Sequence, residues 1–337
     1  MEKNLTSEFL LKLKDYGAKG WIDKKIIFGL QQFYESYKET LEDHGLSMEA
    51  SLPCFFNFLE LLKEQQQRPF IFEPYHAQVR EPFDYYAFGL EFLRPLVDMS
   101  ISSLHGENHA REILSHLSKG RNVILLANHQ SEADPLAISI LLEKIDPRLG
   151  AEMIFVAGER VVTDPLAVPF SMGRNLLCIY SKRYIDFPPE DKLKKQMHNK
   201  KTMELMSSLL KEGGKCIYVA PSGGRDRRNK EGVIEVAPFD PQSIEMFYLM
   251  AKKAGHPTFF YPMALATYDL LPPPETIQVE LGEERKTTHG GIHAAFGPVI
   301  DMENFPGSEN PDKHLRRKAR ADYIWDQVNS DYQKFST

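Results

Sequence analysis

The chain has 337 residues and a net charge of −6 at pH 7, with 42% hydrophobic and 26% charged residues. This length and composition are ordinary for a soluble globular protein and favour one large domain or two unequal ones. The acidic balance argues against a nucleic-acid partner, so any basic site must be a local patch.

Targeting signals and metal-binding patterns are not evident in the sequence. No apolar run approaches the roughly 20 residues needed to cross a bilayer. The N-terminus carries acidic residues rather than the basic start of a secretory signal. The three cysteines are scattered, without the spacing of a metal site or a disulfide framework. We therefore expect no metal and no cofactor, and a cytoplasmic location, or the plastid stroma if a transit peptide has been removed.

The N-terminal part predicts a small helical bundle over residues 1–75. Apolar residues recur there at steps of three and four, the period of one helix face. They are Ile26, Ile27, Leu30, Phe33, Tyr34, Tyr37 and Leu41, then Phe55, Phe56, Phe58, Leu59, Leu61 and Leu62. A proline-rich stretch over residues 67–83 has no clear period, and we interpret it as a linker.

Residues 76–337 predict an α/β catalytic domain. Helical stretches over residues 86–104 and 108–118 lead into short apolar runs that alternate with helices, which is typical of a sheet covered on both faces. The runs are VILLA, MIFVAG, NLLCIY, KCIYVAP, TFFYPMALA, IQVEL and IHAAFGPVI. The last runs are not separated by long helices, so we expect a mixed, mostly parallel sheet flanked by helices.

Polar residues follow the first apolar run, in the segment NHQSEAD. His129 stands where ligands of open α/β sheets bind, and Asp134 with Pro135 marks an expected helix start. A tight turn would bring the Asp134 carboxylate to one ring nitrogen of His129 and leave the other facing a cleft. That is the arrangement of a general base and its orienting acid. On spacing alone, an ordinary helix cap is the commoner explanation.

A second unusual segment, APSGGRDR, ends a later strand. Ser222, Gly223 and Gly224 form a turn of small residues whose backbone amides can approach an anion closely. Arg225 and Arg227 follow, and guanidinium groups match the geometry of phosphate. A phosphate cradle and a solvated basic loop are equally consistent with this segment.

The strand NLLCIY likewise runs into basic residues, Lys182 and Arg183. If this strand neighbours KCIYVAP in the sheet, the two basic ends converge at one rim. A solvated strand end explains either segment alone. Their joint occurrence with the NHQSEAD turn favours a binding site.

Four segments in this order resemble the glycerol-3-phosphate acyltransferase family: NHQSEAD, GRNLLCIYSKRY, APSGGRDR and FYPMAL. The third segment and the helical N-terminal region are most similar to the soluble plastid-type branch, which also occurs in bacteria. The resemblance implies that the chain moves a fatty acyl group from acyl carrier protein (acyl-ACP), or from acyl-CoA, to the sn-1 hydroxyl of glycerol 3-phosphate.

The resemblance also implies roles for individual residues. His129 would be the general base and Asp134 its partner, while Lys182, Arg183, Arg225 and Arg227 would hold the phosphate. No covalent acyl-enzyme is required, so no nucleophilic serine or cysteine is assigned. Backbone amides of the turn Ser222, Gly223 and Gly224 are candidate donors to the oxyanion. One departure is Tyr184, which stands where the branch often has histidine.

Other features leave alternatives open. Basic helical segments at residues 191–201 and 313–320 could dock an acidic carrier protein or make peripheral contact with a membrane, although solvated helix faces are commoner. The Phe-rich helices could line an acyl tunnel. Competing functions are a lysophosphatidate acyltransferase, a non-catalytic phosphate- or phospholipid-binding protein, and a serine hydrolase using Ser222.

Overall fold

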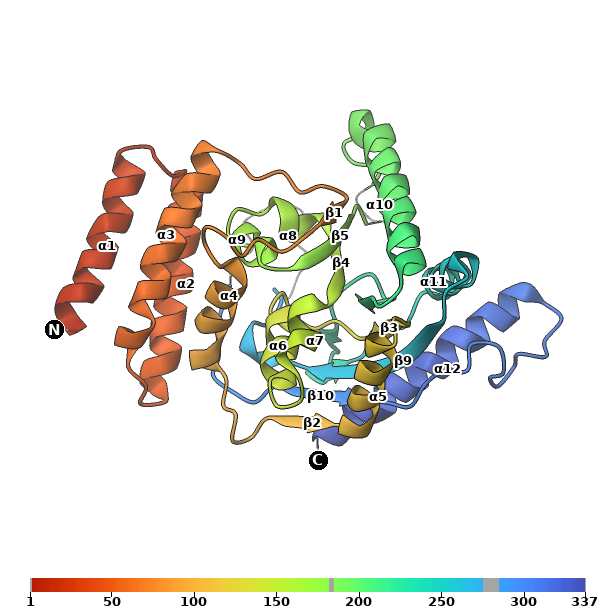
Figure 1. Ribbon diagram of the computed structural model, residues 1–337. Coiled ribbons are helices and arrows are strands. Elements are labelled where there is room, and N and C mark those ends of the chain that lie inside the picture. Colours follow the sequence, from red (N-terminus) through yellow and green to blue (C-terminus); the bar gives the residue numbers. More distant parts are fainter. Residues whose placement is uncertain (1, 182–184, 275–284, 337) are drawn as a thin grey trace.

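The computed structural model of the chain describes residues 2–181, 185–274 and 285–336. Within these residues, the centre is an eight-stranded sheet with the order β1-β5-β4-β6-β3-β9-β10-β2 (Figure 1). Its strands are β1 (Tyr75–His76), β2 (Ser103–His105), β3 (Asn122–Ala127), β4 (Ile154–Gly158), β5 (Asn175–Ile179), β6 (Cys216–Val219), β9 (Thr258–Ala266) and β10 (His293–Phe296). A separate hairpin consists of β7 (Arg227–Arg228) and β8 (Ile234–Glu235).

The sheet is mixed and mostly parallel, which confirms the predicted fold class. Strands β5, β4, β6, β3 and β9 run parallel to one another, so their carboxyl ends meet at one edge, here called the carboxyl edge. Strand β10 is antiparallel to β9 and parallel to β2, and β1 is antiparallel to β5. Parallel neighbours need crossover connections, which the helices supply.

Helices cover both faces of the sheet (Figure 1). They are α1 (Glu2–Ala18), α2 (Lys24–Asp43), α3 (Leu52–Gln67), α4 (Tyr85–Leu93), α5 (Glu107–Ser118), α6 (Asp134–Leu142), α7 (Pro147–Glu152), α8 (Glu159–Thr163), α9 (Val168–Met172), α10 (Lys192–Glu212), α11 (Pro241–Ala254) and α12 (Lys313–Gln333). Successive strand residues point to opposite faces. Val123 and Leu125 therefore join a core shared with the N-terminal helices, while Ile124 and Leu126 join a core shared with α10, α11 and α12.

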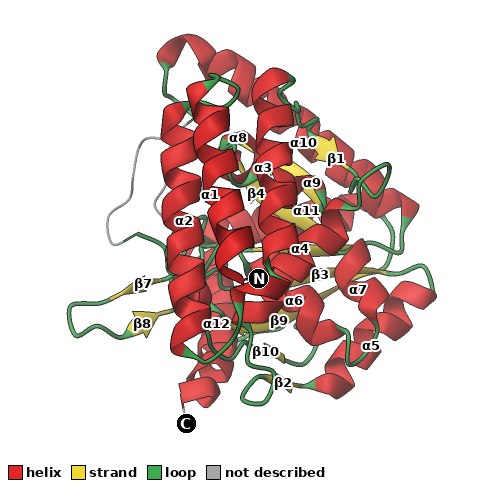
Figure 2. Ribbon diagram, turned by 90° about the vertical axis from the view of Figure 1, so that its left-hand side faces the viewer, coloured by secondary structure: helices red, strands yellow, loops and turns green. Residues whose placement is uncertain are grey.

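The N-terminal helices α1, α2 and α3 form a layer against one side of the molecule (Figure 2). Aromatic rings connect this layer to α4 and α9. The ring centroids of Phe55 and Phe92 are 4.9 Å apart, and those of Phe58 and Phe170 are 5.2 Å apart. Aromatic pairs at such distances pack favourably. The bundle thus shares an apolar core with the sheet, and a domain boundary at residue 75 stays a prediction.

The helix expected over residues 86–104 is shorter in the structure. Helix α4 ends at Leu93, and a 3-10 turn follows over Arg94–Leu96. Pro95 has no amide hydrogen with which to continue an α-helix, which explains the early end. Residues Ser103–His105 form the edge strand β2 instead.

The stretch interpreted as a linker also differs from the expectation. Tyr75–His76 pairs with β5 and closes one side of the sheet as β1. The expected strand IQVEL, at residues 277–281, lies outside the described residues. Among the helices in the described ranges, none combines the length and apolar character that a membrane span requires.

Candidate functional site

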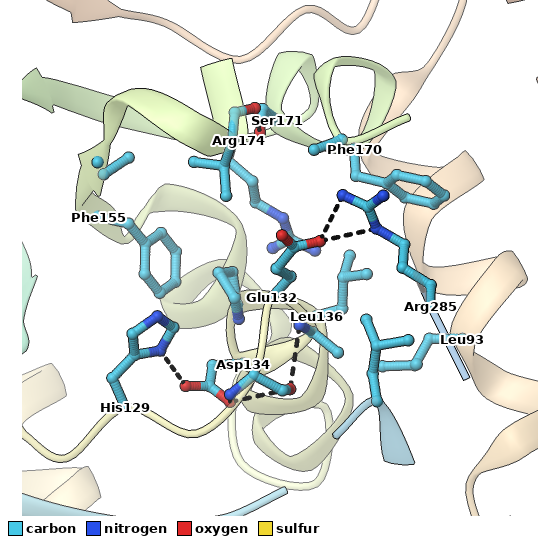
Figure 3. A pocket seen from close by; sticks show the side chains of 18 of the residues that line it. Leu93, His129, Glu132, Asp134, Leu136, Phe155, Phe170, Ser171, Arg174 and Arg285 are labelled. Carbon is cyan, nitrogen blue, oxygen red and sulfur yellow. Dashed lines mark hydrogen bonds and ion pairs between the residues drawn. The ribbon is translucent and has the colours of Figure 1, made fainter. Parts of the chain in front are cut away.

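The NHQSEAD loop places His129 and Asp134 in direct contact, as predicted. His129 Nδ1 lies 2.7 Å from Asp134 Oδ2, and Figure 3 marks this contact between the imidazole ring and the carboxylate by a dashed line. The carboxylate is 1% exposed and the His129 side chain 32%, so a ligand could reach His129 but not Asp134. Because a carboxylate accepts, Nδ1 carries the hydrogen, and Nε2 of the neutral ring is left as the proton acceptor.

The contacts of Asp134 are not those of a helix cap, which was the alternative explanation. Helix α6 begins with Asp134 itself, and its cap residue Ala133 makes no side-chain cap bond. The carboxylate instead accepts hydrogen bonds from the backbone amides of Gln130 and Ser131, at 2.9 and 3.1 Å. The Thr267 hydroxyl, just after β9, donates to Asp134 Oδ1, the oxygen that does not contact His129. These donors fix the carboxylate toward His129.

The rest of the loop is held by neighbouring strands. The Asn128 side chain accepts from the Leu265 amide at 2.7 Å and donates to the Leu265 carbonyl at 2.9 Å. The Tyr218 hydroxyl of β6 donates to the Asn128 carbonyl at 2.6 Å. The Gln130 side-chain oxygen accepts from the Thr267 amide at 2.8 Å. The loop is therefore rigidly placed at the carboxyl edge.

Asp226, which sequence reasoning missed, joins the APSGGRDR segment to this loop. It is fully buried, and its Oδ2 accepts from Asn128 Nδ2 at 2.7 Å and from Gln130 Nε2 at 3.2 Å. Its own backbone amide donates to the His129 carbonyl at 2.6 Å. Burial raises the pKa of Asp226 to about 6, although these donors and the Ala237 amide oppose the rise. The sequence did offer one sign of its importance, since an acidic residue stands there between two arginines.

The predicted phosphate residues flank Asp226. Arg225 and Arg227 are half-buried, and a guanidinium nitrogen of Arg227 donates to the Pro274 carbonyl. Because the Asp226 backbone contacts His129, the backbone of both arginines lies at the same part of the carboxyl edge as His129. Lys182 and Arg183 lie outside the described residues.

The turn before the arginines has the expected glycine geometry. Gly223 has a positive φ of 66°, which few other residues adopt without strain, and its amide donates to the Ala220 carbonyl at 3.1 Å. The Ser222 hydroxyl donates to the Gly224 carbonyl at 2.9 Å. No hydrogen bond between Ser222 and a histidine is found among the described residues, so the contact that would activate a serine nucleophile is missing there.

An apolar cavity adjoins His129 (Figure 3). Its walls combine residues of the sheet, of α4 and α9, and of the N-terminal bundle. They include Phe33, Phe92, Phe155, Leu166, Phe170 and Leu176. A cavity with these walls suits a hydrocarbon chain better than a polar ligand.

Two buried arginines also line this cavity. Arg285 bridges Glu132 of the NHQSEAD loop and Asp164, with N–O distances of 3.0 and 3.1 Å. Burial opposes the charge of Arg285, yet the two carboxylates hold its pKa above the ordinary value. Arg174 donates to the Ser139 hydroxyl at 2.7 Å and lies over the Tyr86 ring, and burial lowers its pKa to about 10. Neither arginine was singled out from the sequence.

A metal centre is not suggested by the side chains. In the part of the chain that the structure describes, no group of three or more His, Cys, Asp or Glu residues is placed to hold a metal ion. What the described residues place at the site is an imidazole held by a carboxylate, beside an apolar cavity.

Comparisons with known proteins identify a family for the chain. The sequence model of a family described as Acyltransferase matches residues 104–266. A chloroplastic glycerol-3-phosphate acyltransferase of Cucurbita moschata is 37% identical over 329 residues, covering 96% of this chain and 73% of that protein. The one of Arabidopsis thaliana is 36% identical over 333 residues, covering 97% and 72%.

A solved structure is also similar at a low level. It is described as the 1-acyl-sn-glycerophosphate acyltransferase of Thermotoga maritima, and it covers 100% of this chain and 98% of its own. The TM-score is 0.40 and the sequence identity 16%, values too low to support an argument about this chain.

Proposed function

Since the chain belongs to the glycerol-3-phosphate acyltransferase family, we propose that it moves a fatty acyl group from acyl-ACP, or acyl-CoA, to the sn-1 hydroxyl of glycerol 3-phosphate. The products are lysophosphatidic acid and a free thiol. The observation that carries this proposal is the pair His129–Asp134, which lies beside an apolar cavity and is bonded through the backbone to the arginine segment.

In this proposal, His129 is the general base. A primary alcohol is a poor nucleophile near neutral pH, so Nε2 takes its proton as the alcohol oxygen attacks the thioester carbonyl. The carbon–oxygen bond forms, the carbon–sulfur bond breaks, and the proton passes to the departing sulfur. The buried Asp134 carboxylate keeps the ring in the required tautomer and stabilises the imidazolium. No acyl-enzyme is formed.

The phosphate of the acceptor is assigned to Arg225 and Arg227. Their support is the short bond from the intervening Asp226 amide to the His129 carbonyl, which keeps the backbone of both arginines near His129. Lys182 and Arg183 are assigned the same role on the resemblance alone. Holding the phosphate positions the hydroxyl for attack and removes the entropy cost of a bimolecular encounter.

The oxyanion that forms on the thioester carbon needs hydrogen-bond donors. We assign this role to the amides of Ser222 and Gly224, because the Gly223 amide already donates to Ala220 within the turn. The acyl chain is assigned to the apolar cavity beside His129. This gives the N-terminal bundle a function, since Phe33 supplies part of the cavity wall.

The names of the relatives place those enzymes in chloroplasts. This supports the plastid-stroma alternative among the locations expected for this chain.

A thiol-release assay tests the proposed reaction. Acyl-ACP and acyl-CoA are each supplied with and without glycerol 3-phosphate, and the lipid product is identified by mass spectrometry. We expect release that depends on glycerol 3-phosphate and yields the 1-acyl product. Release without the acceptor would indicate a hydrolase, and release only with lysophosphatidic acid would indicate the acyltransferase that acts on that lipid. No thiol release with any acceptor would indicate a non-catalytic binding protein.

A further inference from the structure

Helix α10 presents a basic and apolar surface that the proposed chemistry does not use. Its first ten residues, KLKKQMHNKK, contain five lysines and no acid, in a chain whose net charge is −6. Four of these lysines are exposed, and three large apolar side chains are exposed beside them. We call this set the α10 surface: Phe187, Lys192, Leu193, Lys194, Met197, Lys200 and Lys201.

The apolar members of the α10 surface are strongly exposed and lie close in sequence. Leu193 and Met197 are four residues apart, which puts them on one side of the helix, and they are 74% and 72% exposed. Phe187, 68% exposed, precedes the helix, and Lys195 Nζ donates to its carbonyl. Large apolar side chains this exposed and this close together mark an interaction site more often than a solvated helix face.

The cations around these side chains are largely available to a partner. Within the described residues, neither Lys194 nor Lys201 has an ion pair or a hydrogen bond from its side chain. Lys200 approaches Glu204 only at 4.0 Å, and Lys192 pairs with Asp186 at 2.8 Å. A partner with acidic side chains would meet a net positive charge here.

The α10 surface stands at the same edge of the sheet as His129. Thr202 and His198 bond the Cys178 carbonyl at 2.7 and 3.0 Å, which fixes the middle of α10 to the carboxyl end of β5. The helix then runs back toward the start of β6. Its first turns therefore extend beyond the carboxyl edge, and Figure 1 shows them standing out from the body of the molecule.

The shape of this surface favours a protein over the two other acidic partners, coenzyme A and an anionic membrane. It is a protruding helix rather than a concave pocket, which suits another protein better than the small ligand coenzyme A. An interfacial membrane helix needs a broad apolar face. Here the broad face, with Met206, Leu209 and Leu210, is buried in the core.

We propose that the α10 surface docks the acidic acyl carrier protein that delivers the acyl chain, its lysines meeting acidic side chains and Leu193 and Met197 meeting apolar ones. This inference rests on the proposed function and specifies its donor. It makes the enzyme prefer a protein-bound acyl group, because coenzyme A has no protein surface for these side chains to contact.

A double charge reversal, Lys194→Glu with Lys201→Glu, tests the docking. The kcat/KM is measured with acyl-ACP and with acyl-CoA, at saturating glycerol 3-phosphate. We expect a loss of about tenfold or more with acyl-ACP and a change within about twofold with acyl-CoA. A second variant, Leu193→Ser with Met197→Ser, keeps the charges and should lose several-fold with acyl-ACP alone.

The matched control is Lys313→Glu, an exposed lysine at the start of the other basic helix, α12. It should leave both donors unaffected. Equal losses with both donors, or unchanged use of acyl-ACP by both α10 variants, would overturn the docking proposal. So would variants that lose only binding to phosphatidylglycerol vesicles, because that result assigns the surface to a membrane. If the unaltered enzyme makes no product with either donor, the proposed function itself fails.

Discussion

The two polar segments at the carboxyl edge differ in how much of their structure is fixed by the protein itself. In the NHQSEAD loop, Asn128, Gln130, Ser131 and Asp134 are all buried, and the described contacts use their side chains inside the protein. In the segment from Ser222 to Arg227, only Asp226 is buried, and Gly223 and Gly224 are exposed.

This difference matches the two tasks that we assign. A general base must keep one orientation through the reaction, so its support is complete before any ligand arrives. A phosphate site must admit and release a charged ligand, so it stays at the surface. The contrast therefore predicts that the first segment controls the rate of chemistry and the second controls the affinity for the acceptor.

The largest effect is expected at the base. His129→Ala should lower kcat by about 10³-fold, because it removes the imidazole that we propose takes the proton from the alcohol. The Kd of glycerol 3-phosphate, measured by isothermal titration calorimetry, should stay within about twofold. His314→Ala, at an exposed histidine of α12, is the control. A variant that keeps a tenth of the activity would end the assignment of His129 as the base.

A smaller loss is expected when the orienting acid is neutralised. Asp134→Asn should lower kcat by about 10²-fold, since an amide cannot accept from His129, Gln130 and Ser131 as the carboxylate does. The KM for glycerol 3-phosphate should barely change. Asp312→Asn, at the cap of α12, makes the same chemical change elsewhere. A rise in KM without a fall in kcat would show that Asp134 supports substrate binding and not the chemical step.

The second segment should respond in affinity instead. Arg225→Ala should raise the KM for glycerol 3-phosphate by about 10- to 100-fold, the worth of a charge-assisted hydrogen bond, with little change in the KM for the acyl donor. Arg228→Ala is the matched control, because that guanidinium pairs with Asp269 at 2.8 Å. Equal effects on both substrates would erase the contrast between the segments.

The smallest effect concerns Asp226, which lies in the second segment and is hydrogen-bonded to the first. Burial raises its pKa from 3.8 to about 6, so its contribution to stability is present at low pH and is lost as pH rises through 6. Asp226→Asn does not titrate. The free energy of unfolding of the wild type minus that of the variant should therefore be more positive at pH 5 than at pH 7.5, by about 1.4 kcal/mol. Urea denaturation at both pH values measures it, and a constant difference would contradict the raised pKa.

Much of the fold could be predicted because its strands are buried on both faces. Such strands appear as continuous apolar runs, and VILLA and TFFYPMALA correspond to β3 and β9. Helix α11 could also be located, since Asp240 and Pro241 mark its start and Gly255 its end. Strand β2, with three residues, is too short to give a pattern. The end of α4 was missed because the predicted helix was continued past Pro95.

The candidate site was predictable only where its contacts are local. His129 and Asp134 lie within one turn of chain, so their spacing alone suggested the contact. The supports of that pair come from elsewhere in the sequence: Thr267 from the end of β9, Asp226 from beyond β6 and Arg285 from a later loop. Nothing in the spacing of residues so far apart indicates that folding brings them together.

The bond between the Asp226 amide and the His129 carbonyl uses main-chain atoms only. Replacing side chains on either segment removes neither atom of this bond, and the spacing between the proposed base and the arginines proposed to hold the phosphate is set by the course of the polypeptide. Mutation can retune either half of the site separately, whereas inserting or deleting a residue next to Asp226 would spoil the alignment of both halves at once.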